Sequence, residues 1–101
     1  PRVAPAGRAG GPDPVERAVG RLVELDGERG SQLFRTLETY LDRRGNARET
    51  AAALYVHRNT LRQRLRRIAA IIELDPTDPA NWFDLMLAVR LHRFRELAPT
   101  A

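Results

Sequence analysis

The segment from His57 to Arg67, with the sequence HRNTLRQRLRR, holds five arginines in eleven residues and no acidic residue. Arginine binds phosphate and can form two parallel hydrogen bonds to guanine, and the amides of asparagine and glutamine can bind adenine in the same way. An arginine-rich helix is in many proteins only a solvated surface. Here arginines and amides occur together without acids, so the residue types favour a nucleic acid as the ligand.

The positive charge of the chain is concentrated around this segment. Residues 43–72 hold eight of the seventeen basic residues, all of them arginine, and a single acid, Glu49, which gives a local net charge of +7. The remaining residues have a net charge of −3, so the whole chain carries only +4. A strongly basic segment on a mildly acidic frame is the charge distribution expected of a nucleic-acid-binding protein.

The apolar residues of the segment predict which of its side chains are exposed. Leu61, Leu65 and Ile68 are four and three residues apart, which predicts the buried stripe of an amphipathic helix over about residues 58–72. Arg64 lies near the edge of this stripe, where a structural salt bridge and a phosphate contact are both open to it. The side chains opposite the stripe and on its flanks are Asn59, Arg62, Gln63, Arg66 and Arg67. The exposed face therefore consists of amides bordered by guanidinium groups.

The preceding segment, ARETAAAL, predicts a short helix that crosses the arginine-rich one. Asn46 can cap this helix, and three consecutive alanines keep it thin enough for a second helix to approach closely. A tight turn is expected at Tyr55 and Val56, with the tyrosine ring either covering the helix junction or facing DNA. The two helices together predict a helix-turn-helix at residues 46–72, with the second helix, about 58–72, in the major groove of DNA.

The rest of the chain predicts an all-α fold, a small helical bundle of about five helices. Residues 1–12 are rich in Gly, Pro and Ala and are expected to be a flexible linker tail, and residues 13–98 are expected to form one helical DNA-binding domain. No strand-like alternation or internal repeat interrupts the helical pattern. The first residues contain neither an initiator methionine nor a signal peptide, so we expect a piece of a longer, cytoplasmic protein.

Capping residues predict where the other helices begin and end. Asp13 followed by proline predicts the start of the first helix, and its apolar face continues to about Asp26, where DGERG interrupts the pattern. Ser31 is expected to cap a second helix that ends at Gly45. Asp78, again followed by proline, predicts the start of a last and strongly apolar helix.

Several classes of site and activity are not supported by the sequence. Cysteine is absent and the only histidines, His57 and His92, are far apart, so neither a metal site nor a cofactor is expected. Ser31 is the only serine, and no carboxylate pair accompanies a suitable histidine, so the protein is not expected to be an enzyme. No apolar run approaches the roughly 20 residues that cross a membrane.

The sequence resembles the C-terminal DNA-binding domain of PucR/CdaR-type bacterial transcriptional regulators. The resemblance covers about residues 22–95, and its most specific parts are N-x-x-E-T-A at 46–51 and V-H-R-N-T-L-R-x-R-L-R-R-I at 56–68. The central segment is also similar to the helix-turn-helix of the Fis nucleoid protein. The resemblance implies a DNA-reading module in a longer chain whose upstream region senses a signal, in regulators that are often transcriptional activators.

The resemblance and the charge pattern together define a predicted set of DNA contacts. By resemblance, the residues that face bases are Arg58, Asn59, Arg62 and Gln63. Gln63 occupies a position where these regulators frequently have an aromatic residue. The residues expected to contact the DNA backbone are Asn46, Thr50, His57, Thr60, Arg66 and Arg67.

Three functions remain open at the level of sequence. The favoured function is sequence-specific binding of double-stranded DNA by a bacterial transcriptional regulator in the cytoplasm, associated with the nucleoid. The alternatives are an architectural protein that bends DNA with little sequence preference, and a helical protein-interaction module. One recognition helix reads few base pairs, so a homodimer is predicted, with apolar stripes at residues 15–23 and 82–94 as candidate pairing surfaces.

Overall fold

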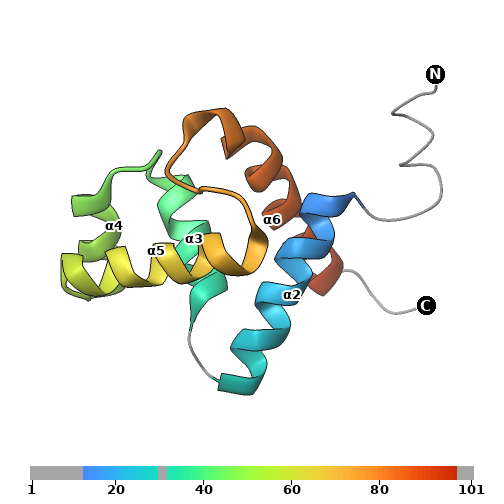
Figure 1. The fold of residues 1–101 in the computed structure, drawn as a ribbon, viewed down its shortest axis with the longest axis horizontal. Coiled ribbons are helices and arrows are strands. Elements are labelled where there is room, and N and C mark those ends of the chain that lie inside the picture. The colour runs from blue at the N-terminus through green and yellow to red at the C-terminus, as the bar shows by residue number, and fades with distance from the viewer. Residues whose placement is uncertain (1–12, 30–31, 98–101) are drawn as a thin grey trace.

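The computed structural model describes residues 13–29 and 32–97, and most of these residues are helical. The helices are α2 (Pro14–Arg29), α3 (Leu33–Asp42), α4 (Ala47–Leu54), α5 (Arg58–Ile72), a short 3-10 helix (Pro79–Asn81) and α6 (Trp82–Leu97) (Figure 1). This part of the chain contains no strand, so the predicted all-α bundle of about five helices is confirmed. The predicted linker tail lies outside the described residues.

Three of the predicted helix starts are confirmed by hydrogen bonds at their caps. The Asp13 side chain accepts a bond from the backbone N–H of Val15 at 3.0 Å, directly before α2. The Asp78 side chain accepts one from Ala80 at 3.0 Å and so begins the 3-10 helix that leads into α6. Asn46 caps α4 in the same way. These bonds satisfy N–H groups that a helix leaves without intrahelical partners.

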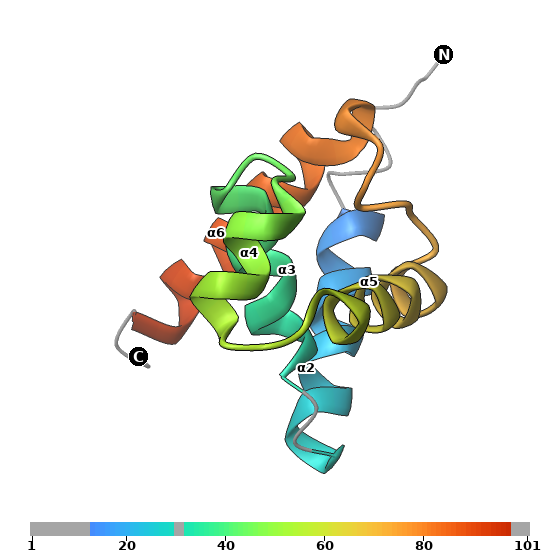
Figure 2. The same cartoon turned by 90° about the vertical axis from the view of Figure 1, so that its left-hand side faces the viewer.

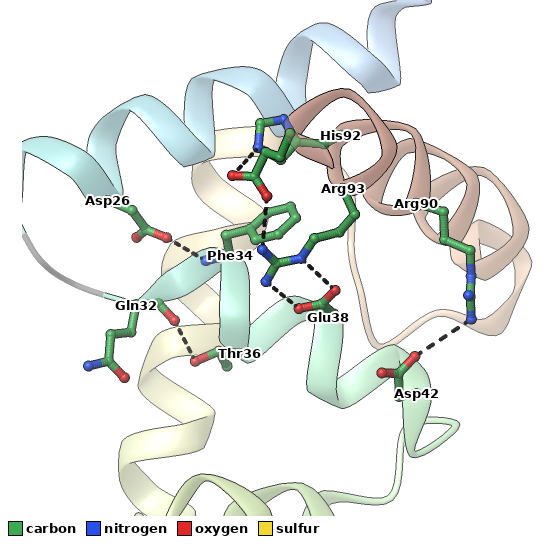
Figure 3. A network of polar contacts seen from close by, with 10 residues as sticks. Asp26, Gln32, Phe34, Thr36, Glu38, Asp42, Arg90, His92 and Arg93 are labelled. Atoms are coloured by element: carbon green, nitrogen blue, oxygen red, sulfur yellow. Dashed lines mark hydrogen bonds and ion pairs between the residues drawn. The ribbon is translucent and has the colours of Figure 1, made fainter. Parts of the chain in front are cut away.

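The connection between α2 and α3 differs from the prediction. Helix α2 does not end near Asp26 but continues through Gly27 to Arg29. The carboxylate of Asp26 accepts hydrogen bonds from the N–H groups of Leu33 and Phe34, both at 2.7 Å, and so caps α3 from the preceding helix (Figure 3). The predicted cap, Ser31, lies outside the described residues.

The hydrophobic core contains residues from all five α-helices, and four of these helices each contribute a residue with no exposed surface. Leu22 of α2, Leu37 of α3, Ile68 of α5 and Leu85 of α6 are each fully buried. Figure 1 shows α4 and the first turns of α5 at the left-hand end of the molecule and α2 toward the right, and Figure 2 shows the same end from the front, with α2 and α6 behind it. The basic helix therefore rests on a core to which the helices outside the helix-turn-helix also contribute.

The two apolar stripes proposed for pairing have different environments. In α2, Val19 and Leu22 are buried, with Val15 and Val23 packed against the same core. The prediction that residues 15–23 offer a pairing surface is therefore wrong, because packing inside the domain already covers this stripe. Helix α6, in contrast, has apolar residues on two sides. Its exposed ones, with their exposed fractions, are Phe83 (75%), Leu87 (46%), Phe94 (68%) and Leu97 (84%).

A polar cluster attaches α6 to α3 (Figure 3). The guanidinium of Arg93 donates hydrogen bonds to both carboxylate oxygens of Glu38, at 2.9 and 2.7 Å, and a third to Glu96 at 2.9 Å. It also lies 4.9 Å from the centre of the Phe34 ring, which forms a T-shaped pair with the ring of His92. The bond from Arg93 holds the pKa of the Glu38 carboxyl below its usual value. Glu38 therefore favours its charged form, which keeps the bidentate pair intact at neutral pH.

The turn between α3 and α4 is packed against the start of α6. Gly45 ends this turn in the left-handed backbone region, with φ +77°. A Cβ atom at this position would lie 2.6 Å from Cζ2 of Trp82 and 2.8 Å from Cη2 of the same ring. The indole Nε1 in turn donates a hydrogen bond to the carbonyl of Pro76 at 2.9 Å. Only glycine fits between the turn and the fixed indole.

Candidate DNA-binding surface

Helices α4 and α5 are joined by a tight turn of three residues. The N–H of Tyr55 bonds to the carbonyl of Ala52 at 3.2 Å, and that of Val56 bonds to Ala51 at 3.0 Å. Tyr55 itself has φ 59° and ψ 42°, the left-handed conformation that commonly ends a helix. His57 then begins α5, because its Nδ1 accepts a hydrogen bond from the N–H of Asn59 at 2.9 Å. The predicted turn is confirmed, and His57 serves as the N-terminal cap of α5.

The division of α5 into a buried and an exposed side follows the predicted pattern. Leu61, Leu65 and Ile68 are all buried, at 1%, 8% and 0% exposure. The exposed residues of this helix include Arg58, Asn59, Arg62, Gln63, Arg66 and Arg67. Thr60 is half-buried. A row of arginine and amide side chains therefore faces solvent along a helix whose opposite side is fixed in the core.

Two of the exposed residues are already linked to each other. The Nη1 atom of Arg62 donates a hydrogen bond to Oδ1 of Asn59 at 2.9 Å, one turn earlier on the helix. The carbonyl oxygen of Asn59 has a second lone pair, and its amide nitrogen keeps two donors. The pair therefore retains the donors and acceptor needed to bond a base edge while each side chain restricts the other.

Two predicted contact residues, Asn46 and Thr50, mainly stabilise the first turn of α4. Thr50 is fully buried, and its hydroxyl donates to the carbonyl of Asn46 at 2.7 Å, so the prediction that its side chain contacts DNA is wrong. Asn46 is exposed, but its Oδ1 accepts from the N–H of Glu49 at 3.0 Å and its Nδ2 donates to the Glu49 carboxylate at 3.2 Å. This reciprocal pair closes the first turn of α4.

Arg64 connects α5 to α3. Its Nη1 donates to the hydroxyl of Thr36 at 3.3 Å, and the side chain is half-buried. Thr36 is itself fully buried and donates to the carbonyl of Gln32 at 2.9 Å. Arg64 therefore has a structural role in joining the two helices. It does so through a hydrogen bond to a neutral hydroxyl and not through a salt bridge.

Further exposed residues at this end of the molecule were not in the predicted contact set. Arg43, Arg44 and Arg48 are exposed at and near the start of α4, where Arg43 lies 3.9 Å from the carboxylate of Glu49. The sequence did indicate these arginines, because all three lie in the basic segment 43–72. Tyr55 is 92% exposed, which rules out a ring that covers the helix junction.

Other kinds of site find no support among residues 13–29 and 32–97. No group of three or more His, Asp or Glu side chains in this part of the chain is arranged to hold a metal ion. None of its helices has the length and hydrophobicity needed to cross a membrane.

Two short helices joined by a three-residue turn, the second with exposed arginines and amides opposite a buried stripe, define a helix-turn-helix domain. The family model of the PucR C-terminal helix-turn-helix domain matches residues 33–91, more than half of the chain. The chain belongs to this family, and it is a DNA-binding domain of the kind found in transcription regulators.

Relatives in two bacterial genera share this domain. An uncharacterized protein of Mycobacterium tuberculosis is 37% identical over 70 residues, which are 69% of this chain and 17% of that protein. The purine catabolism regulatory protein of Bacillus subtilis is 39% identical over 61 residues, covering 60% of this chain and 12% of that protein. The DNA-binding transcriptional activator AdeR of the same organism is 30% identical over 74 residues, which are 73% of this chain and 18% of that protein. The chain thus spans less than a fifth of these relatives. No solved structure gives a significant match.

Proposed function

We propose that this domain binds specific sites on double-stranded DNA by inserting α5 into the major groove, and that it does so within a longer transcriptional regulator. The observation that carries the proposal is the row of exposed arginines and amides on α5, opposite the buried Leu61, Leu65 and Ile68. In such an arrangement the core fixes the helix while its outer face is free to bond base edges. The regulator would act on the nucleoid in the cytoplasm, and a region outside this chain would sense its signal.

The proposed contacts divide into two kinds. Bases would be read by Arg58, Asn59, Arg62 and Gln63, which are exposed on the first two turns of α5. Phosphates would be bound by Thr60, Arg66, Arg67 and His57 and, at the start of α4, by the backbone around Asn46. His57 suits this role because Nδ1 is used as an acceptor in the cap, so that the neutral ring carries its proton on Nε2 and can donate it.

Alanine variants of base-reading and of phosphate-binding residues test the proposal. Arg58→Ala and Asn59→Ala are each expected to weaken binding to the preferred duplex by about 1–3 kcal/mol, and to have much less effect on random DNA. Arg67→Ala is expected to weaken binding to both duplexes alike, because a phosphate contact carries no sequence information. The measurement is a titration of each variant against a duplex selected from a random pool and a scrambled duplex of equal length.

The same titrations separate the specific regulator from the architectural protein. All three side chains are exposed, so the variants are expected to keep the thermal stability of the parent protein. Equal losses on both duplexes for all three would contradict base reading by α5 and favour an architectural protein of low specificity.

We also propose that the protein binds its site as a homodimer, with the outer face of α6 as the pairing surface. Phe83, Leu87, Phe94 and Leu97 fall within a sector of roughly 80° on this helix, opposite its buried residues, and the exposed Arg90 lies in the same sector. Scattered exposed apolar residues need no explanation, but four large apolar side chains on one face of a helix are typical of an interaction surface. A second copy is the natural occupant because two recognition helices read a site long enough to be selective in a genome.

The stoichiometry of the DNA complex tests the dimer. Sedimentation of the protein with a selected duplex is expected to give two copies per duplex, and the double variant Phe83→Ser/Phe94→Ser is expected to give one. Both phenylalanines are largely exposed, so the variant should retain its fold, which circular dichroism can verify. One copy per duplex for the parent protein, with full affinity on a single half-site, would exclude the dimer.

A further inference from the structure

Tyr55 combines two unusual properties. Its side chain is 92% exposed, the highest fraction among the large apolar side chains of the described residues. Its backbone is in the left-handed region, with φ 59°, where a side chain crowds the following carbonyl group. Within the part of the chain that the structure describes, its hydroxyl makes no hydrogen bond that would account for the tyrosine.

The turn itself does not need this side chain. The hydrogen bonds that end α4 come from the backbone N–H groups of Tyr55 and Val56 to the carbonyls of Ala52 and Ala51. The residue that such a turn ordinarily contains is glycine, which enters the left-handed region without steric cost. A tyrosine here weakens the turn and packs against nothing in the domain, so its presence indicates a partner outside the domain.

The position of the turn indicates what that partner is. Tyr55 is two residues before His57, the cap of α5, and three before Arg58, the first residue of that helix. Figure 1 shows the turn at the left-hand end of the molecule, where α5 begins, away from α2. This is the end of the helix that carries the exposed arginines and amides, and its surroundings have a net positive charge. DNA bound there would bring its backbone close to the turn.

We propose that Tyr55 is a DNA-contacting residue, whose hydroxyl donates a hydrogen bond to a phosphate oxygen while its ring lies against the adjacent deoxyribose. The inference rests on the proposed function, because it assumes that α5 enters the groove. Tyrosine is among the residues by which DNA-binding proteins are positioned on phosphates and sugars. The contact would fix the start of α5 relative to the DNA backbone without reading sequence.

The variant Tyr55→Gly separates this role from a structural one, since the two roles predict opposite effects on stability. Glycine relieves the left-handed strain, so the midpoint of thermal unfolding is expected to rise by several degrees. Affinity is expected to fall about tenfold on a selected duplex and equally on a scrambled one, the loss typical of one hydrogen bond to a charged group. The slope of log K against log[salt] is expected to stay unchanged, because the phenol carries no charge.

Two further variants complete the test. Tyr55→Phe keeps the ring and the strain, and it should lose part of the affinity at unchanged stability. Glu73→Gly is the matched control, because Glu73 ends α5 in the same left-handed conformation in which Tyr55 ends α4, with φ 59° at both residues. It should raise the unfolding midpoint in the same way without lowering DNA affinity, and the loss of its negative charge can only favour DNA.

The outcomes distinguish this inference from the proposed function. If the parent protein binds no duplex, the proposed function fails first. If it binds and Tyr55→Gly binds both duplexes equally well, only the role of Tyr55 is overturned. Weaker binding by Tyr55→Gly together with a lower unfolding midpoint, while Tyr55→Phe binds normally, would assign the tyrosine to the fold and also overturn the inference.

Discussion

Duplex binding by this domain is expected to weaken by roughly 250- to 1,000-fold when the salt concentration rises from about 50 to about 200 mM. Residues 43–72 carry a net charge of +7, and most of their arginines are exposed on and around α4 and α5. If about five phosphates are neutralised, each releases condensed counterions, and log K falls against log[salt] with a slope of about −4 to −5. Fluorescence anisotropy of a labelled duplex over a series of salt concentrations would measure this slope.

Single variants can locate the charges responsible. Arg67→Ala is expected to make the slope less negative by about 0.9, the contribution of one phosphate. Arg64→Ala is a suitable comparison on the same helix, because this guanidinium is half-buried and donates to the hydroxyl of Thr36. It should cost stability and change the slope less. A flat salt dependence for the parent protein would argue against a nucleic-acid ligand and favour the protein-interaction module.

Substitution of Gly45 by alanine is expected to destabilise the domain by about 2–5 kcal/mol, adding the cost of a left-handed residue to that of overpacking. The new methyl group would lie 2.6 and 2.8 Å from two carbons of the Trp82 ring, and 3.3 Å from the hydroxyl of Tyr40. The indole cannot move away freely because its nitrogen is bonded to Pro76. Chemical denaturation, monitored by the fluorescence of the single tryptophan, would measure the loss.

A glycine elsewhere in the chain provides the control for this substitution. Gly20 lies in the middle of α2, and a Cβ atom there would meet nothing within 4 Å. Gly20→Ala is therefore expected to stabilise the domain by about 0.5–1 kcal/mol, because alanine has the higher helix propensity. If Gly45→Ala were equally harmless, the close packing of the turn against Trp82 would not exist in solution.

Local signals in the sequence predicted most of the helix boundaries correctly. Asp13, Asn46 and Asp78 each cap a helix through a hydrogen bond to a residue two or three positions later, so a few neighbouring letters contain the whole interaction. The periodicity of Leu61 and Leu65 likewise needs only one helix to be interpreted. Because the exposed face of α5 follows from that periodicity, most of the candidate DNA surface was also predictable from the sequence.

The errors involve interactions between segments that are distant in sequence or hidden by packing. Asp26 caps α3 from seven residues away, which no pattern of adjacent residues indicates. Thr50 has the residue type of a phosphate contact, yet it lies on the buried side of α4. The stripe of α2 could equally have served a second copy or the domain itself, and only the packing of Val19 and Leu22 in the core decided between them.

The participation of α2 in the core also determines what counts as one folding unit. The family match begins at Leu33, after α2 has ended. Even so, Leu22 of α2 is buried in the shared core and Asp26 of α2 caps α3, the first helix of the match. The matched helices therefore depend on α2 for part of their core and for one helix cap. We therefore propose residues 13–98 as the smallest autonomous domain. In a longer regulator, a segment that precedes α2 could displace this helix. Such a displacement would move the core residues against which α5 packs.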